Sequence, residues 1–312
     1  MHYLPRSLVR LLILTVAISL VGCLADSKVA DKEWNAYVGP HRHDLALDGY
    51  KLHYIDIGRG EPVFLLHGFA ANTYSWKRNA QPIVDAGFRV ILVDLPGQGF
   101  SGVPPKNYAA SVENIAGAVL QLADHLKLDK FNVVGVSMGG GLTLYLTWKH
   151  PDRIKRSVVL DPASFDQEVP LVLRMLTTPG LGAVLAEVNG RWTVENSLKK
   201  ITVQRDFLTK TFVDEYTRPL TKPGFNQFIR RLMSDFFSPE FARMVANYDT
   251  IKRPMLIIWG KQDPWIPLEF GERLHALVPD SELLVIDDCG HMVQAERPEV
   301  VNPAVIDFLS GK

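Results

Sequence analysis

The feature that most constrains the fold is the pentapeptide Gly-Val-Ser-Met-Gly at residues 135–139. An apolar run at 131–134 precedes it, and a helix-compatible run at 140–150 follows it. A serine between two glycines at such a junction is typical of a nucleophile elbow, because side chains at the glycine positions would collide with a strained turn. The pattern predicts that Ser137 Oγ projects above a sheet edge, with the Met138 N–H at the start of the next helix.

Short apolar runs alternate with helix-compatible runs along most of the chain. The predicted strands lie at 41–47, 50–57, 62–66, 88–93, 131–134, 157–160, 255–259 and 283–286, the first two joined by an Asp-Gly turn. The predicted helices lie at 76–86, 111–126, 142–150 and 268–277. Strands that are apolar throughout are typical of a parallel sheet covered on both faces. Their alternation with helices indicates an α/β fold, with a mostly parallel eight-stranded sheet flanked by helices.

One interval, residues 165–250, breaks this alternation. It contains no convincing strand, only helical segments interrupted by prolines and glycines. Leucine, phenylalanine, methionine and valine recur throughout it, which indicates a folded insertion rather than a linker. The predicted core therefore consists of residues 41–164 and 251–312, with the insertion after the sixth strand.

The N-terminus has the pattern of a targeting segment. Arg6 and Arg10 form a short basic region before an uncharged apolar stretch at 11–20. This stretch is too short to span a bilayer comfortably, so it predicts a secretory signal peptide over residues 1–22 rather than a transmembrane helix.

The apolar stretch ends in Leu-Val-Gly-Cys at 20–23, which resembles the bacterial lipobox. The resemblance implies that Cys23 becomes the lipidated first residue of a lipoprotein, and several acyl chains on one residue anchor a protein stably in a membrane. Residues 23–40 then form the lipidated cysteine and its tether. Leu24 stands where an inner-membrane retention signal has Asp, which favours the periplasmic face of the outer membrane in the bacterial cell envelope. An ordinary signal peptide cleaved near Ala25 remains the alternative.

Charge and cysteine usage exclude several classes of protein. The chain has 34 basic and 34 acidic residues, so it lacks the positive excess typical of a nucleic-acid-binding protein. The only other cysteine is Cys289, and no intrachain disulfide is expected in the mature protein. No cluster of His, Cys and carboxylate residues has metal-ligand spacing, so we expect neither a metal nor an organic cofactor.

A serine hydroxyl is a poor nucleophile at neutral pH and needs a base and an orienting acid. His291 follows the last predicted strand and is the candidate base. Asp263 follows the preceding strand and is the candidate acid. The chain order Ser137, Asp263, His291 is the order of the α/β hydrolases.

An oxyanion hole would complete this machinery. Its candidate donors are the backbone N–H groups of Met138 and Phe69, the latter in the loop His-Gly-Phe-Ala at 67–70 after the third strand. Open α/β sheets place their sites at the carboxyl ends of the strands, and all these loops leave such ends.

From about residue 40 to 310 the chain resembles a serine hydrolase of the α/β-hydrolase fold. Asp-Leu-Pro-Gly-Gln-Gly-Phe-Ser at 94–101 matches the family's loop after the fourth strand. Trp-Gly-Lys-Gln-Asp at 259–263, and Gly-His at 290–291 followed by Glu-Arg-Pro-Glu at 296–299, match its C-terminal signatures. The resemblance implies that residues 165–250 are a helical lid.

Several residues compete for these roles. Asp161 follows the sixth strand and is the rival acid, because some members of the family take the acid from there. His67 is expected to hold its loop by hydrogen bonding, and Asp287 and Asp288 to be turn residues. Cys289 is better explained by buried packing than by a thiol nucleophile.

The resemblance implies acyl transfer to water through an acyl-enzyme on Ser137. Serine at the elbow argues against haloalkane dehalogenases and epoxide hydrolases, which use aspartate there. The loop at 67–70 lacks the Gly-Gly-Pro-Gly pattern of proline iminopeptidases. We therefore expect a lipase-like carboxylic-ester hydrolase first. The alternatives are a carbon–carbon bond hydrolase, thioesterase or haloperoxidase-type relative, or a lipid-anchored binding protein that has no activity.

The expected substrate is a small apolar ester, because the insertion is rich in apolar side chains. Some of these are expected to line a cavity above Ser137, and the others to form the core of the lid. The candidates are Leu171, Leu173, Met175, Leu176, Phe207, Phe212, Phe236 and Phe237.

Overall fold

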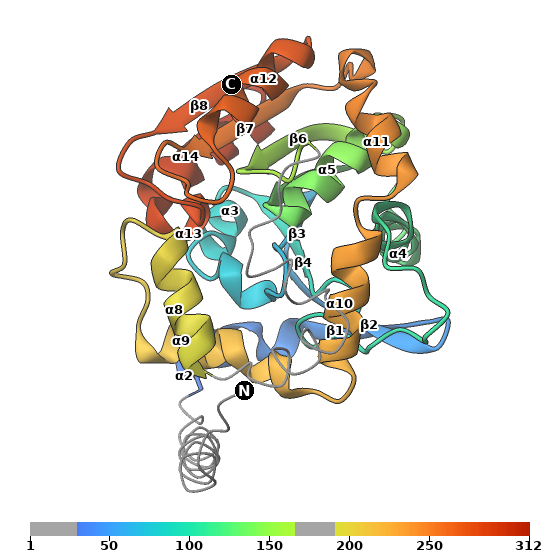
Figure 1. Cartoon of the computed structure of the whole chain (residues 1–312), viewed down its shortest axis with the longest axis vertical. Coiled ribbons are helices and arrows are strands. Elements are labelled where there is room, and N and C mark those ends of the chain that lie inside the picture. The colour runs from blue at the N-terminus through green and yellow to red at the C-terminus, as the bar shows by residue number, and fades with distance from the viewer. Residues whose placement is uncertain (1–29, 166–190) are drawn as a thin grey trace, which may run out of the picture.

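The computed structural model describes residues 30–165 and 191–312, and its centre is one eight-stranded sheet (Figure 1). The strand order is β1-β2-β4-β3-β5-β6-β7-β8, with β1–β2 and β2–β4 antiparallel and the other pairs parallel. The strands are β1 (Arg42–Leu47), β2 (Tyr50–Gly58), β3 (Glu61–Leu66), β4 (Phe88–Val93), β5 (Phe131–Val136), β6 (Ile154–Leu160), β7 (Met255–Gly260) and β8 (Ser281–Ile286). The predicted α/β class and the mostly parallel eight-stranded sheet are confirmed.

Helices cover both faces of this sheet, and each face has its own apolar cluster. On one face lie α4 (Val112–His125), α5 (Met138–Lys149) and α12 (Leu268–Leu277). On the other lie α2 (Lys32–Val38), α3 (Ala80–Asp85), α13 (Val293–Glu296) and α14 (Pro298–Ser310). The central strands β5 and β7 are buried at every position because both of their faces are covered.

Two helix boundaries differ from those expected. The predicted helix at 76–86 is instead a 3₁₀ turn, η2 (Thr73–Trp76), followed by α3. Helix α5 begins at Met138, as the elbow pattern predicted and four residues before the helical run at 142–150, and its first turn includes Gly139, Gly140 and Gly141. A Cβ on Gly140 would lie 2.7 Å from Pro162 Cβ, so close packing against the loop after β6 requires glycine despite its low helix propensity.

The structure of the segment that precedes β1 also differs from the one expected. Within the predicted tether at 23–40, residues 32–38 form helix α2, whose Trp34 is buried. The Asp31 N–H donates to Glu215 Oε1 at 2.8 Å, and the Asp31 carboxylate accepts from Tyr74 Oη at 2.7 Å. The tether prediction is therefore wrong for these residues, because they are docked on the fold. Residues 23–29, with Cys23 and the predicted signal peptide, lie outside the described residues.

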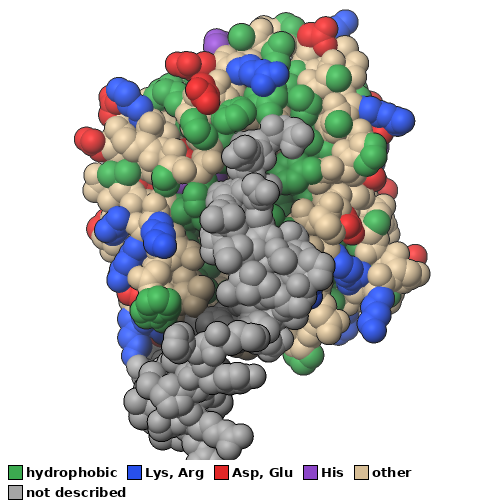
Figure 2. Space-filling model, viewed as in Figure 1, with side chains coloured by type: hydrophobic (Ala, Val, Ile, Leu, Met, Phe, Trp, Pro, Cys, Tyr) green, Lys and Arg blue, Asp and Glu red, His purple; other side chains and the backbone are tan. Residues whose placement is uncertain are grey.

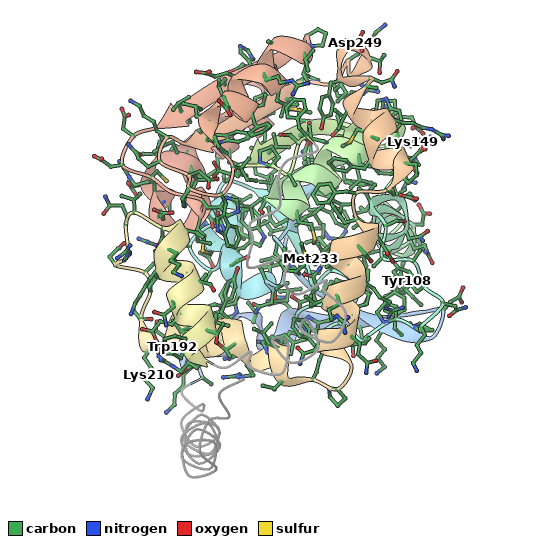
Figure 3. All side chains as sticks on the ribbon, viewed as in Figure 1. Tyr108, Lys149, Trp192, Lys210, Met233 and Asp249 are labelled. Carbon is green, nitrogen blue, oxygen red and sulfur yellow. The ribbon has the colours of Figure 1, made fainter. Side chains whose placement is uncertain are left out.

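Between β6 and β7 the structure describes only helical segments. These are α8 (Arg191–Ile201), α9 (Lys210–Thr217), η3 (Arg218–Thr221), α10 (Phe225–Asp235), α11 (Pro239–Val245) and η4 (Tyr248–Thr250). Figure 1 shows α8 and α9 on one side of the view and α10 and α11 on the other. In Figure 3, Met233 of α10 points toward the middle of the molecule, while Tyr108 and Lys149 lie at its edge. No helix in the described ranges is long and apolar enough to cross a membrane.

Candidate active site

Ser137 lies in the sharp turn between β5 and α5, with φ 55° and ψ −118°. Its N–H donates to Leu160 O at 2.9 Å, and its carbonyl accepts from the N–H of Gly141 and of Ala163. A Cβ on Gly139 would lie 2.2 Å from Leu66 O, and one on Gly135 would lie 2.1 Å from Gly139 O. Both glycines are therefore required by the turn, as the sequence pattern predicted.

His291 and Asp263 are in direct contact. His291 Nδ1 lies 2.6 Å from Asp263 Oδ2, and both side chains are buried. Asp263 Oδ1 accepts from the N–H groups of Trp265 and Ile266 at 2.7 and 3.1 Å, so the carboxylate is held by the turn that follows β7. With Nδ1–H donating to this carboxylate, Nε2 of the neutral imidazole is left as an acceptor.

Ser137, Asp263 and His291 follow β5, β7 and β8, so the three lie at the same edge of the sheet. The described residues include no hydrogen bond between Ser137 and His291. Catalytic hydrogen bonds are often long before substrate binds and tighten in the complex.

Asp161, the rival acid, occupies a different position. It is fully buried, and its Oδ1 accepts from the Gly260 N–H at 2.9 Å. Burial, together with the neighbouring charge of Asp263, raises the pKa of the Asp161 carboxyl well above its ordinary value. The carboxylate partner of the His291 imidazole in this structure is thus Asp263, whereas Asp161 supports the end of β7.

The loop that carries His291 is held by Glu296, whose position in this network the sequence did not reveal. Its carboxylate accepts from the N–H groups of Gly290 and Met292 at 3.0 and 3.1 Å. It also accepts from Val203 N–H at 2.8 Å and Gln204 N–H at 2.9 Å, beyond the end of α8. The only sequence signal was the match of 296–299 to the family's C-terminal pattern.

The two candidate oxyanion donors lie beside the nucleophile. A Cβ on Gly68 would lie 3.2 Å from Ser137 Cβ and 3.7 Å from Ser137 Oγ, so the Gly68–Phe69 backbone passes next to the serine. Neither the Phe69 N–H nor the Met138 N–H has a hydrogen-bond acceptor among the described residues. Both donors are therefore available to an oxygen bound near Ser137.

His67 is fixed away from the reacting groups. Its Nδ1 donates to Gly68 O at 2.8 Å, and its Nε2 accepts from the Leu95 N–H at 3.0 Å. Burial lowers the pKa of the His67 imidazole, although the charge of Asp94 opposes this shift. A neutral His67 that uses both ring nitrogens to hold two loops matches the structural role expected from the sequence.

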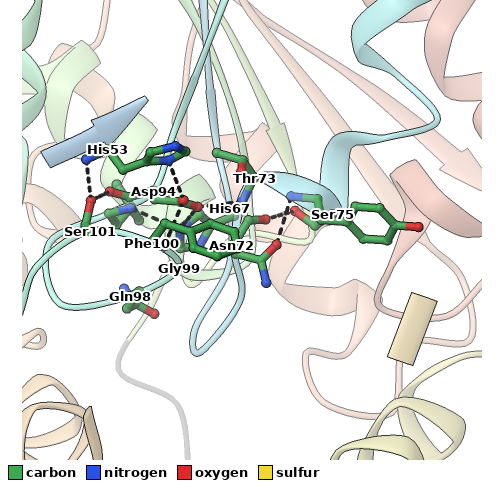
Figure 4. Close-up of polar contacts among 12 residues, drawn as sticks. His53, His67, Asn72, Thr73, Ser75, Asp94, Gln98, Gly99, Phe100 and Ser101 are labelled. Atoms are coloured by element: carbon green, nitrogen blue, oxygen red, sulfur yellow. Dashed lines mark hydrogen bonds and ion pairs between the residues drawn. The ribbon is translucent and has the colours of Figure 1, made fainter. Parts of the chain in front are cut away.

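A buried polar network surrounds Asp94, at the end of β4 (Figure 4). Its Oδ1 accepts from the Thr73 N–H at 2.7 Å, and its Oδ2 contacts His53 Nδ1 at 2.8 Å and the Phe100 N–H at 2.9 Å. Burial opposes ionisation, but the hydrogen bond and charge of His53 outweigh it and lower the pKa of the Asp94 carboxyl. The network joins the loops that follow β3 and β4.

Cys289 is buried beside the His291 loop, and burial raises the pKa of its thiol. A neutral, inaccessible thiol is a packing group and not a nucleophile. Within the ranges that the structure describes, no group of three or more His, Cys, Asp or Glu residues could hold a metal ion.

Of the apolar side chains in the insertion that were expected to line a cavity or to form a core, the described ones pack mainly against each other and against the rest of the molecule. Phe212 contacts the rings of Tyr74, Phe207 and Tyr216. Phe236 contacts the ring of Phe237. Leu171, Leu173, Met175 and Leu176 lie outside the described residues. In Figure 2, hydrophobic side chains are visible mostly in the upper half of the face that is shown, and charged side chains lie mainly nearer its edges.

Comparison with known proteins gives a consistent family. A family model described as the alpha/beta hydrolase fold matches residues 61–298. A 2-hydroxy-6-oxononadienedioate/2-hydroxy-6-oxononatrienedioate hydrolase of Pseudomonas putida is 32% identical over 297 residues, covering 90% of this chain and 99% of that protein. A 2-hydroxy-6-oxo-6-phenylhexa-2,4-dienoate hydrolase of Burkholderia cepacia is 29% identical, covering 86% of this chain and 94% of that protein. The solved structure of a meta-cleavage product hydrolase from Pseudomonas fluorescens aligns with a TM-score of 0.72 at 25% identity, covering 86% of this chain and 97% of the other.

Proposed function

Because the chain belongs to the α/β-hydrolase fold family, we propose that it is a serine hydrolase that cleaves a carbon–carbon bond beside a ketone carbonyl. The observation that carries the choice of bond is the 32% identity to a dienedioate hydrolase over nearly the whole length of both proteins. The sequence patterns favoured an ester first and kept this reaction as an alternative, and the relatives support the alternative better. The proposed substrate class is a 2-hydroxy-6-oxo-dienoate.

In the proposed mechanism, Ser137 Oγ attacks the 6-oxo carbonyl carbon while His291 Nε2 takes the hydroxyl proton. Asp263, 2.6 Å from His291 Nδ1, holds the tautomer and stabilises the imidazolium. The Phe69 and Met138 N–H groups donate to the oxyanion. Collapse of the tetrahedral intermediate breaks the bond from the carbonyl carbon to its carbon neighbour, and the leaving fragment accepts the proton from the His291 imidazolium. Water then hydrolyses the acyl-enzyme with His291 as base.

A carbon leaving group needs delocalisation of the electron pair that it takes with it. In a 2-hydroxy-6-oxo-dienoate, transfer of the enol proton to carbon first gives a 2-oxo acid conjugated to a double bond. The electron pair of the broken bond then spreads into that system. The protein's part is to hold the ketone between Ser137 and the oxyanion donors and to supply protons through His291.

Hydrolysis of an ester with an apolar acyl group is the second candidate. It is favoured by the apolar surroundings of the catalytic groups: the Trp265 ring lies at a tilt to the His291 ring, with 5.4 Å between the ring centroids, and Met138 is buried beside the serine. An apolar acyl pocket gains about 0.8 kcal/mol for each methylene buried. For this candidate, kcat/KM of p-nitrophenyl esters should rise with acyl length and fall once the pocket is full.

The test is a direct comparison of the two bond types. Purified protein is assayed with 2-hydroxy-6-oxo-6-phenylhexa-2,4-dienoate, with 2-hydroxy-6-oxononadienedioate and with p-nitrophenyl butyrate, using the Ser137→Ala variant as the blank. A higher kcat/KM on either dienoate supports carbon–carbon cleavage. Turnover of the ester alone overturns that choice of bond and assigns the second candidate.

We also propose that the protein is held in the bacterial cell envelope by lipid on Cys23. The support is the match of 20–23 to the lipobox directly after an uncharged apolar stretch. If so, the eight residue-to-residue steps from Cys23 to Asp31 reach at most about 29 Å. The docked helix α2 would then keep its face of the molecule close to the membrane.

A further inference from the structure

The loop after β4, residues 94–101, holds the loop after β3, residues 67–73, at three points. The Leu95 N–H donates to His67 Nε2 at 3.0 Å, Gln98 Oε1 accepts from the Ala70 N–H at 2.7 Å, and Asp94 Oδ1 accepts from the Thr73 N–H at 2.7 Å. These contacts lie before and after Gly68–Phe69, the stretch that passes beside Ser137. One loop therefore fixes the backbone that carries a candidate oxyanion donor.

Gln98 makes the contact nearest to that donor. Its side chain is fully buried, and its backbone is fixed by hydrogen bonds from its N–H to Leu95 O and from the Ser101 N–H to its carbonyl. Because the Ala70 N–H is a donor, the oxygen of the Gln98 amide must face it, which fixes the orientation of the amide. Its Nε2 has no partner among the described residues.

The residue that Gln98 holds is strained. Ala70 has φ 53°, in the left-handed region that is costly for a residue with a Cβ. Its N–H belongs to the peptide that joins it to Phe69, and the described residues offer that N–H no other acceptor. Without the Gln98 oxygen, this partly buried donor loses the one acceptor that the described residues give it, and the peptide is free to turn.

We propose that Gln98 is a positioning residue of the oxyanion hole: its side-chain oxygen fixes the Phe69–Ala70 peptide and so aims the Phe69 N–H at the oxyanion. This deepens the proposed function and rests on it, because it assumes that Phe69 donates to the oxyanion formed on the Ser137 substrate. Gln98 itself touches no reacting atom. The side chain of Gln98 reaches the oxyanion hole through its hydrogen bond from the Ala70 N–H.

The first test is Gln98→Met, which keeps the length of the side chain and removes the acceptor. Removing a whole oxyanion donor costs about 10²–10³ in kcat, so misplacing one should lower kcat by about 10- to 100-fold, with KM changed by less than about threefold. Affinity for a trifluoromethyl ketone, which forms a tetrahedral adduct with the serine, should fall by the same factor as kcat/KM. If Gln98 has only a structural role, Gln98→Met should lower thermal stability without lowering inhibitor affinity and kcat/KM by the same factor.

The matched control is Gln121→Met, on the exposed side of α4. This substitution should leave kcat and KM unchanged. Gln98→Glu keeps an oxygen for the Ala70 N–H, and when protonated it is neutral like the native amide. Its activity relative to wild type should therefore rise as the pH falls, since a buried carboxyl has a raised pKa.

Unchanged kcat and inhibitor affinity in Gln98→Met, in a protein whose turnover requires Ser137, would overturn the role of Gln98 alone. Turnover that survives Ser137→Ala would instead overturn the proposed function. If Gln98→Met does not fold, a folded Gln98→Glu variant tests the role of Gln98 instead. An activity relative to wild type that does not change with pH would then contradict the proposal.

Discussion

At the residue scale, Ser137, Asp263 and His291 are the candidate reacting groups, and the side chains of Glu296 and Gln98 hold the loops beside them. Ser137 could be predicted because its turn requires a glycine on each side, and that requirement is local. Asp263 and Asp161 both follow strands, so the sequence could only rank them, and the contact with His291 distinguishes them. Glu296 and Gln98 act on backbone groups of distant loops, and no local pattern records such contacts.

The assignment of the acid gives the first prediction. Asp263→Asn should lower kcat by about 10³–10⁴, because an amide stabilises the wrong imidazole tautomer and no imidazolium. Asp161→Asn should lower it by less than about tenfold, because the asparagine oxygen can still accept from the Gly260 N–H. Steady-state kinetics of the two variants decide, and a larger loss in Asp161→Asn would move the acid to the loop after β6.

Asp161 also predicts a dependence of stability on pH. Its pKa is raised in the folded state, so above the unfolded value of about 3.9 the unfolded chain releases a proton that the folded chain keeps. This contribution destabilises the fold increasingly as the pH rises, and it levels off once the pH exceeds the folded pKa. The gain in melting temperature of Asp161→Asn over wild type should therefore grow from pH 4 upward. Calorimetry that finds a constant difference would show that the folded pKa of Asp161 is not raised.

At the element scale, strands were predicted more reliably than helix starts or docked segments. A strand covered on both faces is apolar throughout, and β5 and β7 have that pattern. The elbow pattern placed the start of α5 at Met138, but the helix-compatible run began only at residue 142, because packing against Pro162 outweighs the poor helix propensity of the glycines before it. Helix α2 was taken for a tether because its contacts, such as that of Asp31 with Glu215, are distant in sequence.

The start of α5 provides a test with a matched control. Gly140→Ala places a Cβ 2.7 Å from Pro162 Cβ and should reduce the free energy of unfolding by about 1–3 kcal/mol. Gly117→Ala, in α4, meets no atom within 4 Å and should increase it by about 0.5–1 kcal/mol. Urea unfolding curves measure both. Equal effects at the two positions would contradict the account of why α5 begins with glycines.

At the scale of the whole molecule, the fold could be predicted from the sequence but the bond that is cleaved could not. Alternating strands and helices specify the α/β class without any knowledge of long-range contacts. Ester and carbon–carbon hydrolysis can use the same serine, histidine and oxyanion donors, so the triad pattern does not separate them. The apolar residues of the insertion were also ambiguous, because a lid's own core and a pocket wall have the same composition.

The N-terminal prediction belongs to this scale as well. We expect the mature protein to begin at Cys23 and to carry acyl chains, and Cys23→Ser to remain uncleaved or to be released in soluble form. Mass spectrometry of the mature N-terminus from a bacterial host with the lipoprotein pathway measures this. An unmodified chain that begins near Asp26 would identify an ordinary periplasmic protein.

The most direct test of the central claim is the turnover of Ser137→Ala on the better substrate of the panel. Only Oγ is removed from a turn that the backbone holds by itself, so the circular dichroism spectrum and melting temperature should match those of the wild type. The account predicts that kcat falls by at least about 10³, to the level of the reaction without enzyme. A folded Ser137→Ala variant that keeps turnover near the wild-type level would show that this serine is not the nucleophile.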